Sequence, residues 1–110
     1  MDIGALHFQI TNGNFAIRSH AIQHAVKEGF TKEDMIHAIL NGSIIDGSVI
    51  ERYPGRKRCL FCADVIIEGL TMPLHVICEH LHPKSPVDFV TAYIPSEEEW
   101  ETPTQRRRKK

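Results

Sequence analysis

The 110-residue sequence lacks the features that would send a chain into or across a membrane. No apolar run approaches the eighteen or more residues that a transmembrane helix needs. Residues 1–10 have neither a basic start nor a sustained apolar stretch, so we expect no signal peptide. We therefore expect a cytoplasmic protein without a membrane partner.

Cysteine is scarce and odd in number, with Cys59, Cys62 and Cys78. In a chain that is not exported, three cysteines argue against a disulfide framework. A zinc site is the alternative, because Cys59-x-x-Cys62 and Cys78-x-His80-x-His82 offer sulfur and nitrogen ligands. However, strand alternation would send Cys59 and Cys62 to opposite sheet faces, and no glycine follows them to form a knuckle turn. We expect thiols that fill core space, and neither a metal nor another cofactor.

Short catalytic motifs are also absent. The sequence has no glycine-rich phosphate-binding loop, nucleophile elbow or dinucleotide fingerprint. Three cysteines and seven histidines permit a Cys–His nucleophilic pair on residue types alone, but no local motif supports one.

The net charge of −1 conceals an uneven distribution of charged residues. Five of the thirteen basic residues form the terminal run 106–110, and without that run 8 basic residues face 14 acidic ones, a charge of −6. A folded domain with a net negative charge does not attract nucleic acid over its whole surface, so nucleic-acid binding must depend on local basic clusters. There are two of these, the terminal run and Arg52 with Arg56, Lys57 and Arg58.

Length and composition predict one domain. A chain of this size supports one modest core, and contents of 42% hydrophobic and 25% charged residues are ordinary for a globular domain. We place this domain at residues 1–95. Residues 96–110 should form an acidic and then basic tail, partly disordered, with Trp100 docked on the body.

Two short helices are predicted between Ser19 and Gly42. Ser19 and Thr31 are suited to be N-caps, and Gly29 and Asn41-Gly42 are suited to be stops. Each helix has an apolar stripe with which it can cover a sheet. The stripes are Ala21, Ile22, Ala25 and Val26 in the first helix, and Met35, Ile36, Ile39 and Leu40 in the second.

Strands are predicted on both sides of the helical pair. Leu6, Phe8 and Ile10 alternate as in a first strand, and residues 15–17 could return the chain as a hairpin; the alternative is a loose N-terminal arm.

After the helices the sequence predicts three or four strands. Residues 43–53 form the first, interrupted at Asp46-Gly47. Further strands follow at residues 58–68, 74–80 and 87–94, with a turn at residues 69–73 and antiparallel pairing of neighbours. The expected core faces are Cys59, Phe61, Ala63, Val65 and Ile67 on one strand and Leu74, Val76 and Cys78 on the next.

This order predicts an α+β domain. Two N-terminal helices pack on one face of a three- to five-stranded antiparallel sheet, and the other sheet face is open for binding.

The ordered set of local motifs resembles the domain-of-unknown-function family 4258, a bacterial group of small proteins. The resemblance covers about residues 19–101. The matching pieces are Ser19-His20-Ala21, Gly29-Phe30-Thr31, Asn41-Gly42, Tyr53-Pro54, Pro73-Leu74-His75-Val76, and Thr91-Ala92-Tyr93-Ile94-Pro95 followed by Trp100.

Members of that family are similar in fold to the RelE and MqsR toxins. The resemblance therefore implies a RelE-like α+β fold, a ribonuclease-like activity and an antitoxin partner, often of the zinc-finger type. One position departs from the family pattern, because His24 stands where the family has an arginine three residues after the alanine of the first motif. A neutral imidazole holds a phosphate less firmly than a guanidinium does.

Metal-independent RNA cleavage needs a base for the 2′-hydroxyl, cations at the phosphate and an acid for the leaving oxygen. The residues that suit these roles are His20 and His24 on one helical face, Arg56 and Arg58 in a loop entering a strand, and Tyr93 near the end of the last strand. Further RNA-binding candidates are Arg52, Lys57 and His75. The alternative for each group is a residue with no functional role: solvent-facing histidines, arginines in a solvated turn, and a half-buried tyrosine of the sheet.

The sequence thus leads to two hypotheses. The first is a toxin-like RNA-binding domain, with RNA cleavage undecided, held in check by an antitoxin. It requires the imidazoles of the first helix and the guanidinium groups after Pro54-Gly55 to converge on one hollow. The second is a non-catalytic interaction domain that binds a partner or forms a homodimer through the open sheet face and the Trp100 tail.

Overall fold

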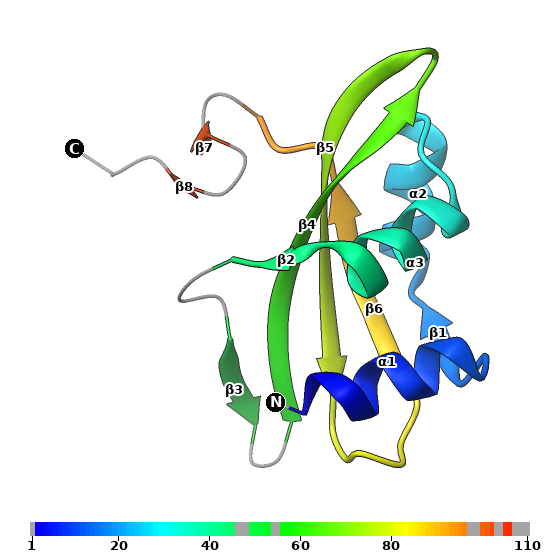
Figure 1. The fold of residues 1–110 in the computed structure, drawn as a ribbon, viewed down its shortest axis with the longest axis vertical. Coiled ribbons are helices and arrows are strands. Elements are labelled where there is room, and N and C mark those ends of the chain that lie inside the picture. The colour runs from blue at the N-terminus through cyan, green and yellow to red at the C-terminus, as the bar shows by residue number, and fades with distance from the viewer. Residues whose placement is uncertain (1, 46–48, 54–55, 97–99, 103–104, 107–110) are drawn as a thin grey trace.

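The computed structural model describes residues 2–45, 49–53, 56–96, 100–102 and 105–106. Within these residues the protein has an α+β fold with three helices on one side of a mixed sheet (Figure 1). The helices are α1 (Ile3–Thr11), α2 (Ser19–Glu28) and α3 (Lys32–Asn41). The strands are β1 (Phe15–Ile17), β2 (Ser43–Ile44), β3 (Ile50–Tyr53), β4 (Arg56–Ile67), β5 (Leu70–His80), β6 (Val87–Tyr93), β7 (Trp100–Thr102) and β8 (Gln105–Arg106).

The predicted first strand is wrong, because residues 3–11 form α1. Asp2 caps this helix by accepting a hydrogen bond from the backbone N–H of Ala5. Leu6 and Ile10 are buried, and Phe8, which lies between them, is 63% exposed. A spacing of four residues fits one helical face as well as one strand face, so the alternation of three apolar residues did not distinguish the two.

The two predicted helices are confirmed as α2 and α3, but Ser19 is the first residue of α2 and Arg18, not Ser19, is its N-cap. Gly29 ends α2 in the left-handed region with φ 86°, and Thr31 and Asp34 form a capping box at the start of α3. The stripe on α3 is confirmed. The stripe on α2 is half wrong, because Ala21 and Ala25 are buried whereas Ile22 and Val26 are 49% and 81% exposed.

The central sheet has the strand order β1-β6-β5-β4, with β2 and β3 both paired to β4. Its pairs are antiparallel except β1 with β6, which are parallel. The predicted hairpin at residues 15–17 and the all-antiparallel sheet are therefore wrong. Residues 43–53 hold two strands, β2 and β3, and Asp46-Gly47, where the interruption was expected, lies outside the described residues.

The turn between β4 and β5 consists of Glu68 and Gly69 instead of residues 69–73. Both have positive φ, 50° and 81°, as a two-residue type I′ hairpin requires. Pro73 lies inside β5 opposite Asp64, beyond the point where β6 stops pairing at His75. A proline is tolerated there because that side of β5 is an edge.

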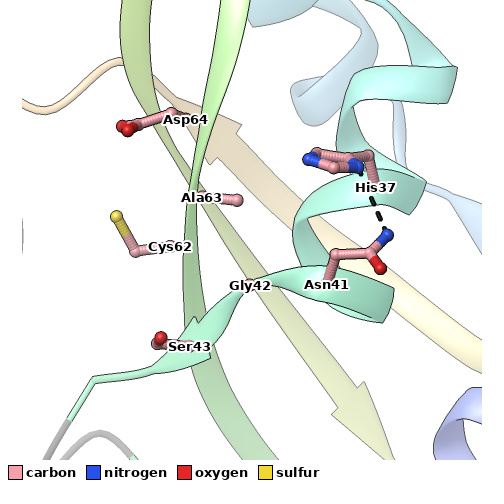
Figure 2. Close-up of a pocket in the computed structure, with 7 residues that line it drawn as sticks. All are labelled: His37, Asn41, Gly42, Ser43, Cys62, Ala63 and Asp64. Carbon is pink, nitrogen blue, oxygen red and sulfur yellow. Dashed lines mark hydrogen bonds between the residues drawn. The ribbon is translucent and has the colours of Figure 1, made fainter.

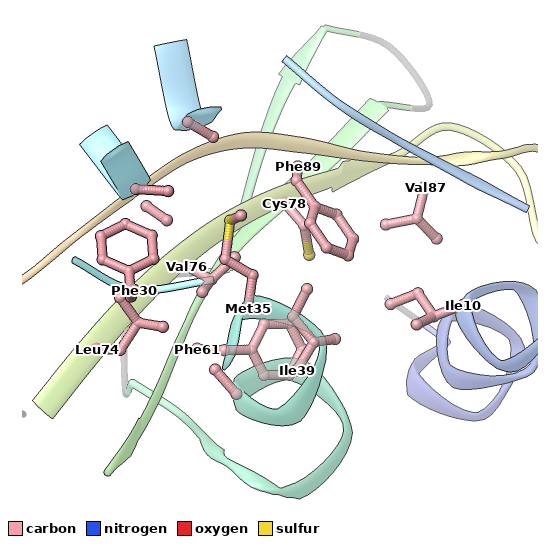
Figure 3. Close-up of a cluster of buried hydrophobic side chains, with 14 of the residues drawn as sticks. Ile10, Phe30, Met35, Ile39, Phe61, Leu74, Val76, Cys78, Val87 and Phe89 are labelled. Atoms are coloured by element: carbon pink, nitrogen blue, oxygen red, sulfur yellow. The ribbon is translucent and has the colours of Figure 1, made fainter. Parts of the chain in front are cut away.

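The core lies between the helices and one face of the sheet (Figure 3). The predicted core faces of β4 and β5 are confirmed, and Phe61, Leu74 and Val76 are buried against Met35 and Ile39 of α3. Among the described helices, none has the length and apolar character needed to cross a membrane. The described part of the tail pairs β7 with β8, and the predicted domain boundary at residue 95 stays a prediction.

Candidate functional site

Strand register assigns a set of side chains to the sheet face opposite the helices, which we call the outer face. These side chains alternate along β4 and β5 with those of the core. The cross-strand pairs on the outer face are Arg58–Glu79, Leu60–Ile77 and Cys62–His75. The outer face therefore changes from charged at one end to apolar in the middle and aromatic at the other end. The expectation that this face is open is wrong for its middle, because Leu60 and Cys62 are each 8% exposed and form a buried cluster with Ile45.

Three arginines meet two carboxylates at the charged end, and we call these five residues the arginine network. Glu79 on β5 accepts hydrogen bonds from Arg58 Nε at 2.8 Å and from Arg56 Nη1 at 3.2 Å. Arg18, just before α2, forms ion pairs with Glu79 at 3.4 Å and with Asp88 at 3.3 Å. Arg56 also reaches Asp88 at 3.3 Å. The arginine network therefore ties the start of α2 to three neighbouring strands.

The arginine network keeps Glu79 ionised. Burial raises the pKa of Glu79, but hydrogen bonds from Arg58 and Arg56, together with the charges of Arg58 and Arg18, outweigh it, so the pKa lies below its ordinary value. The hydrogen bond to Glu79 is also the main reason that the pKa of Arg56 is raised. Glu79 thus remains an acceptor at neutral pH.

The arginine network has three positive charges against two negative ones. Its carboxylate at Glu79 is 2% exposed, whereas the side chains of Arg18, Arg56 and Arg58 are 44%, 31% and 19% exposed. Each guanidinium has five N–H donors, more than the described contacts use. The exposed rim of the arginine network can therefore donate hydrogen bonds to an anion such as a phosphate.

His75 and Tyr93 form the aromatic end of the outer face. Their rings meet edge to face with centroids 5.3 Å apart, and His75 Nδ1 lies 3.5 Å from the Tyr93 hydroxyl. A register shift between Cys78–Phe89 and Ile77–Thr91 leaves Val90 as an extra residue in β6. This bulge moves Tyr93 to the outer face, since unbroken alternation from buried Phe89 would send it to the core. His75 is fully buried, so Tyr93 is the partly exposed member of the pair.

His20 and His24 form a second group on α2. Their rings are 4.6 Å apart, centroid to centroid, and His24 Nδ1 lies 3.0 Å from Glu28 Oε2. The other oxygen of Glu28 accepts a hydrogen bond from the backbone N–H of Ile94 at 3.2 Å. A carboxylate held by the backbone just after β6 therefore orients one imidazole, which packs against the other.

The two groups are neighbours through Arg18. His20 follows Arg18 by two residues, so their backbones lie within about 7 Å of each other. No described hydrogen bond or ion pair joins the histidines to the arginine network, so the predicted convergence on one hollow stays a prediction. Arg56 and Arg58, however, lie within β4 rather than in a loop that precedes a strand.

Two of the predicted RNA-binding residues, Lys57 and Arg52, are not part of the arginine network. Lys57 is exposed and, because it alternates with Arg56 and Arg58, points to the opposite side of β4. Arg52 belongs to β3, and its side chain lies outside the described residues.

The cysteines divide as strand alternation predicted. Cys59 and Cys78 are fully buried in the core with their sulfur atoms 3.8 Å apart, and Cys62 lies on the outer face. Hydrogen bonding to Cys59 and burial raise the pKa of the Cys78 thiol well above its ordinary value. His80 instead contacts the backbone oxygen of Ser85 at 2.9 Å. The described residues contain no cluster of three or more potential metal ligands.

A shallow hollow of about 520 Å³ lies at the edge of β4 where α3 ends (Figure 2). Its lining comes from the end of α3, the start of β2 and the middle of β4: His37, Asn41, Gly42, Ser43, Cys62, Ala63 and Asp64. His37 and Asn41 are joined by a 3.2 Å hydrogen bond. The candidates for RNA chemistry all lie elsewhere.

Sequence reasoning missed three members of the arginine network, Arg18, Glu79 and Asp88. One signal was present, since Arg56 and Arg58 share a face of β4 and Glu79 lies on the expected outer face of β5. Asp88 depended on the register of β6, and Arg18 depended on the parallel strand β1, which was not foreseen.

A family model described as "Domain of unknown function (DUF4258)" matches residues 17–94. Comparison with curated proteins gave no match, and comparison with solved structures gave none either.

Proposed function

The chain belongs to the DUF4258 family, and we propose that it shares both the RelE-like fold and the toxin-like function that the sequence resemblance implies. The protein is a toxin-like domain that binds RNA at the two ends of the outer face of its sheet, the arginine network and Tyr93. An antitoxin partner covers that face when the protein is inactive.

The observation that carries this proposal is the arginine network. Away from the basic terminal run the chain has a charge of −6, so a local excess of positive charge is the feature that RNA would find. The rim of the arginine network offers Arg18 and Arg56 to the backbone, and Glu79 holds them in place from below. Bidentate guanidinium contacts are well suited to phosphate oxygens.

Tyr93 extends the proposed RNA path. His75 and Glu79 are four residues apart on β5, so the aromatic end of the outer face is about 13 Å from the arginine network. RNA recognition commonly stacks an unpaired base on an aromatic ring. In this proposal Tyr93 contacts a base, and His75 positions Tyr93 from its buried site.

Cleavage is assigned to the histidines of α2. His20 is exposed and next to the oriented His24–Glu28 pair, an arrangement that can accept and return a proton. Arg18, two residues before His20, would hold the phosphate beside them.

We expect Arg18→Gln to weaken RNA binding and to lower its salt dependence. The substitution leaves two arginines against two carboxylates, so the excess charge disappears. Fluorescence anisotropy with a short single-stranded RNA at several salt concentrations should show the slope of log K against log salt falling by about 0.7, the loss of one phosphate contact.

Lys57→Gln is the matched control, because it removes one positive charge from the same stretch on the opposite side of β4. It should leave the slope unchanged. If both substitutions weaken binding equally, the outer face is not the RNA site.

We expect His20→Ala to abolish cleavage while RNA binding stays within about twofold of the unaltered protein. The proposed mechanism uses imidazoles and no metal, so cleavage of RNA by the unaltered protein should continue in EDTA. Expression in bacteria should arrest growth, and His20→Ala should relieve the arrest. Cleavage that stops in EDTA, or that survives His20→Ala, contradicts this assignment.

The non-catalytic interaction domain remains the second candidate. It is favoured by the negative charge outside the terminal run and by the fact that Arg18, Arg56 and Arg58 are all ion-paired within the chain. This function predicts free expression and no RNA binding.

A further inference from the structure

The β4–β5 hairpin extends beyond the rest of the central sheet. On one side β2 stops pairing with β4 at Cys62, and on the other side β6 stops pairing with β5 at His75. Residues 63–67 and 70–74 therefore form a two-stranded ribbon, which Figure 1 shows reaching past the other strands. Ile66 and Leu70 near its tip are 72% and 66% exposed.

Hydrogen bonding fixes which backbone groups point outward along the ribbon. The N–H of Ile45 donates to the C=O of Leu60, so even-numbered residues of β4 turn their backbone groups away from β5. The same alternation applies to Asp64 and Ile66. Since β2 pairs with β4 only as far as Cys62, no strand in the described part of the chain pairs with this side of Asp64 and Ile66, and this segment of β4 is an open edge.

The other edge of the ribbon is closed to pairing. Pro73 lies opposite Asp64, so its backbone nitrogen also faces outward, on the β5 side. Proline has no N–H to donate, and an edge proline blocks strand addition. The ribbon therefore offers one edge to a partner strand.

We propose that this edge binds the same edge of a second copy of the chain, antiparallel and centred on Val65. This register places Asp64 opposite Ile66 of the second copy and the reverse. Both residues turn their backbone groups outward, so each of the two pairs can exchange two backbone hydrogen bonds. Ala63 lies opposite Ile67, and the two Val65 side chains meet at the twofold axis.

Charge selects this register over its neighbours. A twofold axis at Asp64 would bring two carboxylates face to face, and an axis at Ile66 would bring Asp64 opposite Glu68. Like charges directly opposite each other destabilise a strand pair. Centring on Val65 avoids both contacts, so the edge complements itself.

The hollow of Figure 2 lies where the proposed partner strand ends. Ser43 already pairs with Cys62, so the partner strand must end at Ile67, opposite Ala63. The turn residue Glu68 of the second copy then leaves the edge next to His37, Asn41 and Ser43, which line the hollow. Amide, hydroxyl and imidazole groups can donate hydrogen bonds to that carboxylate. The hollow therefore has the position and chemistry to receive the turn of the second copy.

Charge substitutions at Ile66 test the register. Sedimentation velocity of the full chain over a concentration series should show a monomer–dimer equilibrium. Ile66→Asp places a second carboxylate opposite Asp64, twice in the dimer, and should raise the dissociation constant about tenfold or more. Ile66→Lys places an ammonium there and should keep or lower it. Since Ile66 is 72% exposed, neither change should disturb folding.

Thr71→Asp is the matched control, because Thr71 is exposed, pairs with Ile66 and lies on the closed edge of the same ribbon. It should leave the dissociation constant unchanged. Amide hydrogen exchange supplies a second measurement, since dimerisation should protect the N–H groups of Asp64 and Ile66 but not that of Thr71.

Two results would overturn the proposal. One is a chain that stays monomeric across the series, including one that binds only a different protein at this edge. The other is a dimer that responds alike to Ile66→Asp, Ile66→Lys and Thr71→Asp, which would place the interface elsewhere. Neither result depends on RNA binding, so the dimer and the proposed function can fail separately.

Discussion

Glu79→Ala is expected to lower the free energy of unfolding by about 3 kcal/mol. The carboxylate is 2% exposed and pairs with Arg18, Arg56 and Arg58, so its removal leaves three guanidinium groups without this buried counter-charge. The exposed parts of these arginines keep the cost at the lower end of the range for broken buried ion pairs. Thermal unfolding should show the loss as a shift of roughly 10–15 °C in Tm.

The comparison with Asp88→Ala separates burial from charge. Asp88 contacts Arg18 and Arg56 but is 30% exposed, so its removal should cost less than about 1 kcal/mol. Equal losses for the two substitutions would contradict the central role of Glu79.

The pH dependence has a defined sign. Since the folded-state pKa of Glu79 is lowered, its stabilising effect is complete above the ordinary glutamate pKa of about 4.3 and is lost as pH falls through the folded-state value. The difference in stability between the unaltered protein and Glu79→Gln should therefore be constant from pH 7 to about 5 and shrink below about pH 4.

Gly42→Ala is expected to destabilise the protein by about 3 kcal/mol. A Cβ atom at this position would lie 2.2 Å from the backbone oxygen of Ala38 and 2.5 Å from that of Cys62. Both neighbours are backbone atoms, one in α3 and one in β4, so the clash can be relieved only by moving the helix end away from the sheet. Chemical denaturation would measure the loss.

Gly4→Ala is the control for this substitution. The nearest atom to a Cβ at Gly4 is 3.5 Å away, an ordinary contact, and the residue lies within α1. Replacing a helical glycine with alanine should stabilise the protein by about 0.5–1 kcal/mol. Opposite signs for the two substitutions would show that close packing, rather than glycine replacement itself, causes the loss at Gly42.

Local signals predicted the parts of the fold that depend on neighbouring residues. Caps at Gly29 and Thr31 set the helix boundaries, and strict alternation in β4 identified its core face. Predictions failed where the same spacing of apolar residues fits both a helix and a strand, and where the structure depends on pairing between segments that are far apart in the sequence. Leu6 and Ile10 fit a strand as well as a helix, and β1 joins the sheet beside β6, some seventy residues away.

In the candidate site, too, residues close together in the sequence were predicted, and features that depend on distant strands were not. Arg56 and Arg58 were found because they are close together in the sequence, and the structure brings them to Glu79. Tyr93 was chosen for its place near a strand end, but its position on the outer face depends on the bulge at Val90. The sequence around Val90 carries no marker of a bulge, such as a glycine, so the face that Tyr93 occupies could not be read from the pattern.

Pro73 limits how large an assembly of this chain can become. If both edges of the β4–β5 ribbon could pair with another strand, each added molecule would bind a further one, and the product would be an unbounded filament. With one side capped by a residue that cannot donate, growth through this contact stops as soon as two molecules have met. If the chain self-associates as proposed, Pro73 in β5 makes a pair, and not a fibre, the end point.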